Sequence, residues 1–165
     1  MRGLGTEKLL QKVNISPRLA LFLHILSYLC TVFCIFAFGY MLLHFLLLSW
    51  ISALCFCLIL GISFVLVSLL RKLIDAPRPY EVYDFYLSKP KSKHGQSFPS
   101  RHVFSAFAIG TLCVFVNPVV GGITLALGAV MCFCRVALGI HFVRDVLCGA
   151  IIGVLSSLIG ILILL

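Results

Sequence analysis

Acidic side chains are scarce in this sequence. Only five of its 165 residues are Asp or Glu, and they are scattered, with no Asp-x-Asp motif and no group of carboxylates. A magnesium site in a protein needs carboxylate oxygens that lie close together. The sequence therefore gives no sign of such a site, and we expect neither a metal nor another cofactor.

Charged residues of either sign are missing from one long stretch. From Leu19 to Leu70 there is no Asp, Glu, Lys or Arg, and the whole chain is 62% hydrophobic and only 11% charged. This composition is too apolar for a soluble domain. A secretory signal peptide would be followed by a polar mature chain, whereas here the apolar character continues to Leu165. We predict an integral membrane protein.

Metal-like cysteine spacing is also missing. None of the eight cysteines stands in a polar loop with a Cys-x-x-Cys pattern. Buried thiols in apolar stretches act as small hydrophobic groups. We therefore expect neither a disulfide framework nor a zinc site from Cys30, Cys34, Cys55, Cys57, Cys113, Cys132, Cys134 and Cys148.

The apolar stretches divide into membrane crossings. The run 19–70 is too long for one helix and too short for three, because each crossing needs about 20 residues; we expect two helices with a turn near residues 41–49. Further crossings are expected at about 98–116, 121–137 and 146–165. The sequence thus predicts an all-α, polytopic membrane helix bundle with about five transmembrane helices.

Polar segments separate these helices. Residues 1–18 are predicted to form an N-terminal polar or interfacial segment, ahead of one membrane-embedded domain at 19–165. Residues 71–97 contain three prolines and a glycine, and we expect a surface loop there because exposed polar backbone is not tolerated in hydrocarbon. The last helix has small residues that would let another helix approach closely: Gly149, Ala150, Gly153, Ser156, Ser157 and Gly160.

A five-helix count places the ionisable residues together. The N-terminus, the loop 71–97 and the linker 138–145 then share one face of the membrane, where three clusters, 71–79, 99–102 and 134–145, project. The usual explanation for a net charge of +8 in a membrane protein is the positive-inside rule together with contacts to anionic lipid headgroups. Nucleic acid is not an expected partner, because no basic face with interleaved aromatic residues lies outside the membrane.

Two features of these clusters point to phosphate chemistry. Arginine forks and the free amides of a helix N-terminus bind phosphate oxygens, and Pro99-Ser100 suits such a helix start, where Ser100 either caps the helix or binds an oxyanion. Plain capping together with headgroup anchoring is the alternative interpretation. His141 and Asp145 are four residues apart and would share a helix face, so the carboxylate could orient the imidazole as a nucleophile. His102 is then free to protonate a leaving oxygen.

The three clusters also resemble a family. Arg71-x6-Arg78-Pro79, Pro99-Ser100-Arg101-His102 and Cys134-Arg135-x5-His141-x3-Asp145 are similar to the signature motifs of the type 2 phosphatidic acid phosphatase superfamily, which usually read Lys-x6-Arg-Pro, Pro-Ser-Gly-His and Ser-Arg-x5-His-x3-Asp. Three positions differ. Arg71 replaces Lys, although the neighbouring Lys72 could fill that role; Arg101 replaces Gly; and Cys134 replaces Ser.

The resemblance implies a role for each residue. His141 would form a phosphohistidine, Asp145 would orient it, and His102 would act as the general acid and later as the base that activates water. The phosphate would be bound by Arg71 or Lys72, Arg78, Ser100 and Arg135, with Arg101 as an added cation whose role the resemblance does not supply. Glu81, Asp84 and the tyrosines of 80–86 are expected to shape the loop over the site.

The resulting hypothesis is a membrane phosphatase acting on a lipid phosphate or diphosphate. Undecaprenyl diphosphate, phosphatidylglycerophosphate, phosphatidate and lipid A phosphate all remain candidates, and the oligomeric state is open. The alternatives are a non-catalytic protein that binds or transports phospholipids or anions, and, more remotely, vanadate-dependent oxidase chemistry. The resemblance favours an active site on the outer face of the cell membrane, whereas the basic N-terminus favours the cytoplasmic face.

Overall fold

Helices make up all the regular structure in the residues that the computed structural model describes, which are 16–82 and 94–164. The expected all-α class is therefore confirmed. Most of the predicted N-terminal segment, together with Asp84 and part of the loop 71–97, lies outside the described residues. The helices are α2 (Pro17–Leu48), α3 (Trp50–Ile74), α4 (Pro79–Val82), α5 (Arg101–Val116), α6 (Pro118–Ala137) and α7 (Val143–Leu164).

Polar caps set the helix boundaries at the turns far from the clusters. Ser49 is extended and lies between α2 and α3; its amide donates to the Phe45 carbonyl and its hydroxyl accepts from the amide of Ile51. The side chain of Asn117 accepts from the first amides of α6, and Pro118 occupies the first turn, where no amide donor is needed. The expected turn in residues 41–49 is thus confirmed at its last residue, and α6 begins at Pro118, three residues earlier than expected.

Four of the helices, α2, α3, α6 and α7, are long and apolar enough to cross a membrane. The fifth, α5, has only 16 residues, about 24 Å at 1.5 Å per residue, which is less than the hydrocarbon thickness of about 30 Å. It begins at Arg101 rather than near Phe98 because residues 97–100 are not helical. Since α5 is buried among α2, α3, α6 and α7, its length need not match the bilayer.

Small residues on α7 allow it to lie directly against α5. A Cβ at Gly149 would come within 2.7 Å of the Ser100 carbonyl oxygen, and one at Gly153 within 2.6 Å of the Phe104 oxygen. Four residues after Gly153, the Ser157 hydroxyl donates a 2.8 Å hydrogen bond to the Ala108 carbonyl. The close approach predicted from the small residues of this helix is confirmed.

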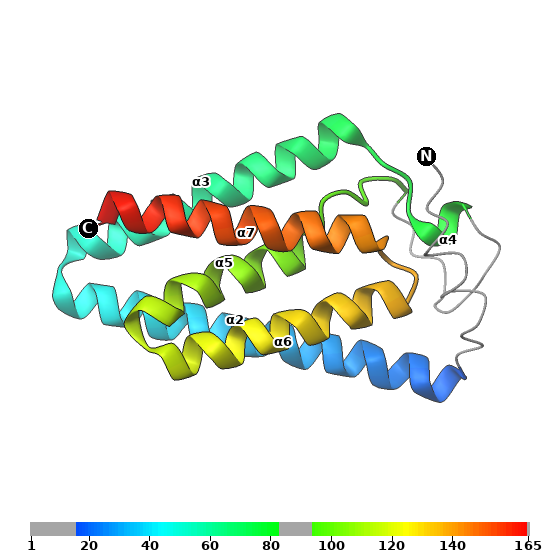
Figure 1. Ribbon diagram of the computed structural model, residues 1–165, viewed down its shortest axis with the longest axis horizontal. Coiled ribbons are helices and arrows are strands. Elements are labelled where there is room, and N and C mark those ends of the chain that lie inside the picture. The colour runs from blue at the N-terminus through cyan, green and yellow to red at the C-terminus, as the bar shows by residue number, and fades with distance from the viewer. Residues whose placement is uncertain (1–15, 83–93, 165) are drawn as a thin grey trace.

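The helix ends that carry the polar clusters meet at one end of the bundle. Figure 1 shows the end of α3, the short α4, the starts of α5 and α7 and the end of α6 together at the right of the view, whereas the turn between α2 and α3 and the turn between α5 and α6 lie at the opposite end. The predicted convergence on one face is therefore present. The outward surfaces of α2 and α3 are rich in exposed large apolar side chains, as lipid-facing surfaces are.

Candidate active site

The segment 97–100 is fixed between two helices before α5 begins. The Ser97 amide donates to the Ala76 carbonyl (2.8 Å), and the Ser100 amide donates to the Asp145 carbonyl (3.0 Å). Arg71, in the last turn of α3, donates from Nη1 to the Pro99 carbonyl at 2.5 Å. These bonds tie the end of α3, the start of α5 and the start of α7 into one unit.

A buried group of three side chains lies beside this segment. Oδ2 of Asp145 is 3.6 Å from Nδ1 of His141, and the Ser97 hydroxyl lies 2.5 Å from the same Oδ2 and 3.3 Å from the same Nδ1. His141 is 3% exposed, and Asp145 and Ser97 are fully buried. A carboxylate and a hydroxyl thus face one ring nitrogen of His141, which leaves Nε2 as the nitrogen that can act on a substrate.

His141 is placed by the turn before α7 rather than by a helix. It lies in the linker after α6, where Gly139 has a φ of +62° and the His141 amide donates to the Arg135 carbonyl (3.2 Å). Asp145 folds back from the first turn of α7 to accept from the Phe142 amide at 3.0 Å. The predicted pairing of His141 with Asp145 is therefore present, although α7 begins only at Val143.

Burial sets the charge state of this histidine. Loss of solvent lowers the pKa of His141, and the nearby Arg78 and Arg135 act in the same direction, while Asp145 opposes them. The net shift is downward, so the ring is neutral at pH 7. A neutral imidazole is the form that can attack phosphorus.

Ser97 is a site residue that the sequence analysis missed. It stands two residues before Pro99, outside the three clusters, and a serine at the end of a polar loop resembles any other loop serine. The available signal was its place directly before the apolar dipeptide Phe98-Pro99, where the chain leaves the loop for the bundle interior.

Three arginines converge near the same group. Arg71 is buried, Arg78 is half-buried and donates from Nε to the Gly95 carbonyl (2.9 Å), and Arg135 has a buried Nε that makes no hydrogen bond within the described part of the chain. Arg78 and Arg135 both interact electrostatically with His141. Lys72, the alternative to Arg71, is exposed. Of the two, Arg71 is therefore the one that is buried at the site.

Ser100 is the residue before α5, yet its hydroxyl does not cap that helix. The side chain is fully buried, and Oγ has no hydrogen-bond partner among the described residues. A buried hydroxyl without a partner is unfavourable unless a ligand supplies one. Of the two roles weighed for Ser100, capping is not observed, and the free hydroxyl fits the binding of an oxyanion.

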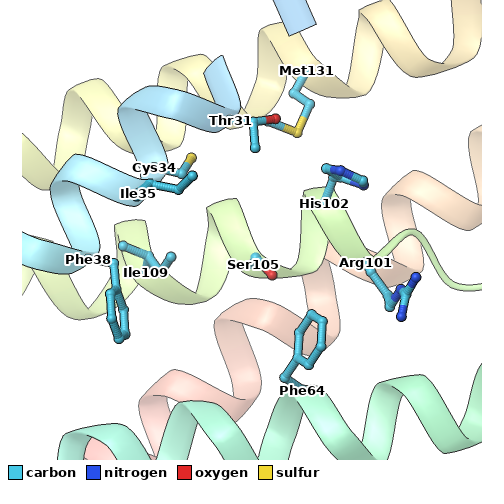
Figure 2. A pocket seen from close by; sticks show the side chains of 10 residues that line it. All are labelled: Thr31, Cys34, Ile35, Phe38, Phe64, Arg101, His102, Ser105, Ile109 and Met131. Carbon is cyan, nitrogen blue, oxygen red and sulfur yellow. The ribbon is translucent and has the colours of Figure 1, made fainter. Parts of the chain in front are cut away.

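His102 and Arg101 lie at the start of α5 beside an apolar cavity. The cavity has a volume of about 390 Å³ and is lined by side chains of α2, α3, α5 and α6, among them Phe38, Phe64 and Met131. Figure 2 shows both basic residues at one end of it, His102 on the side of Met131 and Arg101 on the side of Phe64. His102 also interacts electrostatically with Arg135, His141 and Arg71.

Two carboxylates organise the loop next to the site. Glu81 accepts from the amides of Arg78 and Gly95, each at 2.8 Å. Asp75 ends α3 in the left-handed conformation and accepts from the Gln96 amide (3.1 Å). Gly95 has a φ of +67°, and a Cβ there would collide with the Asp75 carboxylate. Glu81 thus holds the loop as expected, and Asp75 acts on the backbone rather than on the arginines.

The described residues contain no group of three or more His, Cys, Asp or Glu side chains arranged to hold a metal ion. Arg144 is exposed, with its Nε 3.5 Å from Oδ1 of Asp145 and its guanidinium over the ring of Phe142 at 5.2 Å.

Comparison with protein-family models identifies one family. The model described as PAP2 superfamily matches residues 52–164, well over half of the chain. The matched region contains all three clusters and Ser97. It begins at the start of α3 and continues to the last residue of α7.

Two solved structures share the fold. LpxE of Aquifex aeolicus superposes with a TM-score of 0.68 and 25% identity, over 90% of this chain and 88% of that one. The first transmembrane PAP2 type phosphatidylglycerolphosphate phosphatase from Bacillus subtilis gives a TM-score of 0.68 and 23% identity, over 96% of this chain and 81% of that one. The bundle therefore has the fold of these two proteins.

A curated relative matches a shorter region. The bacitracin transport permease protein BcrC of Bacillus licheniformis is 39% identical over 62 residues, which is 38% of this chain and 30% of that protein. The match thus spans less than a third of the relative's own length.

Proposed function

The chain belongs to the PAP2 superfamily, and on that premise we propose that it is an integral membrane phosphatase that hydrolyses a lipid phosphate or diphosphate. The observation that carries the proposal is the buried group of His141, Asp145 and Ser97. A neutral imidazole, oriented by a carboxylate and faced by arginines, is arranged for attack on a phosphorylated substrate. A protein that only binds an anion does not need an oriented, neutral imidazole of this kind.

The proposed reaction has two steps. Nε2 of His141 attacks the phosphorus while His102 protonates the oxygen that leaves, so a phosphohistidine forms and the dephosphorylated lipid is released. His102 then takes a proton from water, which attacks the phosphohistidine and frees inorganic phosphate and His141. Asp145 stabilises the imidazolium that develops during the attack.

Positive charge stabilises the transition state. Arg71, Arg78 and Arg135 bind the equatorial phosphate oxygens, and the free hydroxyl of Ser100, with the first amides of α5, supplies further donors. These groups come from the protein alone, so the proposed reaction needs no metal.

The apolar cavity accounts for a lipid substrate. Its volume of about 390 Å³ is within the range of small-molecule sites, and it ends at His102. A hydrocarbon chain in this cavity places its phosphate at the cationic end of the bundle. Undecaprenyl diphosphate, phosphatidylglycerophosphate, phosphatidate and lipid A phosphate are all compatible with this arrangement.

Phosphate release decides between this proposal and a transport function, which the name of the Bacillus licheniformis relative makes worth testing. Purified protein in detergent is incubated with a panel of lipid phosphates and diphosphates in the presence of EDTA. We expect release of inorganic phosphate, and loss of that release in His141→Ala. No release from any lipid, or full turnover by His141→Ala, contradicts the phosphatase.

We propose further that the site faces the outside of the cell membrane. His94 has a side chain that is 89% exposed, beside the site, and provides a labelling position. In a cysteine-free background, His94→Cys should react with a membrane-impermeant maleimide in intact cells. Labelling only after the cells are lysed would place the site in the cytoplasm.

A further inference from the structure

The proposed reaction of a simple phosphate ester assigns no role to Arg101. It occupies the position of the glycine in the family's usual Pro-Ser-Gly-His motif, and it is half-buried at the start of α5. Its guanidinium lies over the ring of Phe64 at 5.8 Å from the centroid. A contact of this kind orients the side chain, so Arg101 is held in place rather than free in solution.

Arg101 differs from the other arginines of the site because its side chain lines the cavity. Among the side chains that line the cavity in the described residues, Arg101 and His102 are the only basic ones, and Arg71, Arg78 and Arg135 are not in its lining. The terminal phosphate must meet His141, and the hydrocarbon chain occupies the cavity. Because His102 and Arg101 both lie at one end of the cavity (Figure 2), we expect the part of the substrate that joins them to pass these two residues.

The charge of that joining part depends on the substrate. In a lipid monophosphate the leaving group is an alcohol, which is neutral once His102 has protonated it, and a cation there gains nothing. In a lipid diphosphate the leaving group is itself a phosphate monoester, which keeps a negative charge even with the proton from His102. An arginine at this point, in an apolar setting, stabilises only the second leaving group.

Resting on the proposed function, we infer that Arg101 binds the inner phosphate of a lipid diphosphate, which makes a lipid diphosphate the preferred substrate class. His141 forms a bond to the terminal phosphorus, and the bond from that phosphorus to the bridging oxygen breaks. The bridging oxygen leaves on the lipid monophosphate with the proton from His102. Water then cleaves the phosphohistidine, so the products are lipid monophosphate and inorganic phosphate.

The test compares two substrates that differ by one phosphate. We measure kcat/KM for a prenyl diphosphate and for the prenyl monophosphate of the same chain length, in the wild type, Arg101→Gln, Arg101→Lys and Arg101→Gly. Arg18→Gln is the matched control, because Arg18 is an exposed cation in the first turn of α2 and lies outside the cavity lining.

We expect the wild type to favour the diphosphate. Arg101→Gln and Arg101→Gly should lower the ratio of the two kcat/KM values by about 10-fold or more, since a charge-assisted hydrogen bond is lost for one substrate only. Arg101→Lys should lower it less, because the charge remains but the bidentate fork does not. Arg18→Gln should keep the wild-type ratio.

Other results overturn the inference in distinguishable ways. A variant that is merely less stable loses both activities together, so an unchanged ratio in Arg101→Gln shows that Arg101 only packs against Phe64. A wild-type preference for the monophosphate contradicts the diphosphate class and leaves the phosphatase standing. Hydrolysis of neither prenyl substrate contradicts the diphosphate class, whereas the proposed function itself is contradicted only if no lipid of the wider panel releases phosphate.

Discussion

The hydroxyl of Ser97 donates a 2.5 Å hydrogen bond to Oδ2 of Asp145, across 48 positions of sequence. Both side chains are fully buried, and the same hydroxyl lies 3.3 Å from Nδ1 of His141. Ser97 therefore fixes the carboxylate that in turn orients the histidine. In the proposed reaction it is a positioning residue, since it faces Asp145 and the inner nitrogen of His141 rather than the substrate.

Replacing this serine tests its role. Ser97→Ala should lower kcat by about 10-fold or more, the usual cost of a lost buried hydrogen bond to a charged group, and should leave KM nearly unchanged because no contact with the lipid is removed. Ser156→Ala is the matched control, since its hydroxyl only bonds within α7. An increase in KM at constant kcat would instead assign Ser97 to substrate binding.

The pH dependence of the reaction should report on His141. Because burial lowers the pKa of His141 and Asp145 raises it, removing the carboxylate charge in Asp145→Asn should lower that pKa further. The neutral nucleophile then persists to lower pH, so the acidic limb of kcat/KM should move to lower pH although the rate itself falls. Titration of the substrate is common to both proteins and cancels in the comparison. A limb that moves to higher pH contradicts the assignment of His141 as the group that titrates.

The sequence was informative where the physical signal is local. The charge-free run from Leu19 to Leu70 and the three polar clusters predicted the helices and their shared end, because hydrophobic length and motif spacing are properties of the chain itself. The close packing of α7 was visible in Gly149 and Gly153, since small residues at four-residue spacing have few other uses in a membrane helix.

The remainder depends on tertiary packing. The short length of α5 is tolerated only because the other helices surround it, and the inward direction of Arg71 depends on the rotation of α3, neither of which the sequence determines. Ser97 becomes a site residue only through α7, which is far away in sequence. The cavity beside Arg101 likewise arises from four helices that meet in space.

The rotation of α3 leads to a third prediction. Arg71→Ala should lower kcat/KM by about 100-fold, because it removes a buried cation that both faces the site and bonds the Pro99 carbonyl. Lys72→Ala should keep wild-type activity, since Lys72 is exposed. Arg71→Lys should retain part of the activity through its charge. Kinetics of the three purified variants on one substrate provide the measurement, and a larger loss in Lys72→Ala than in Arg71→Ala would contradict the orientation of α3.

The contact between α5 and α7 gives the last prediction. Gly149 has no room for a side chain, because a Cβ at this position would lie only 2.7 Å from the Ser100 carbonyl oxygen. Gly149→Ala should therefore separate the starts of the two helices, lower the stability by about 1–3 kcal/mol, and reduce kcat, since the Ser100 amide bonds the Asp145 carbonyl at this same place.

Gly122→Ala is the control for this change. Gly122 is also in a helix, but a Cβ there meets nothing within 4 Å, so alanine should leave activity intact and raise stability by up to about 1 kcal/mol through helix propensity. Thermal unfolding in detergent and kcat are measured for both variants. If Gly149→Ala matched Gly122→Ala in both measurements, the close approach of α7 to Ser100 would not be what positions Asp145 beside His141.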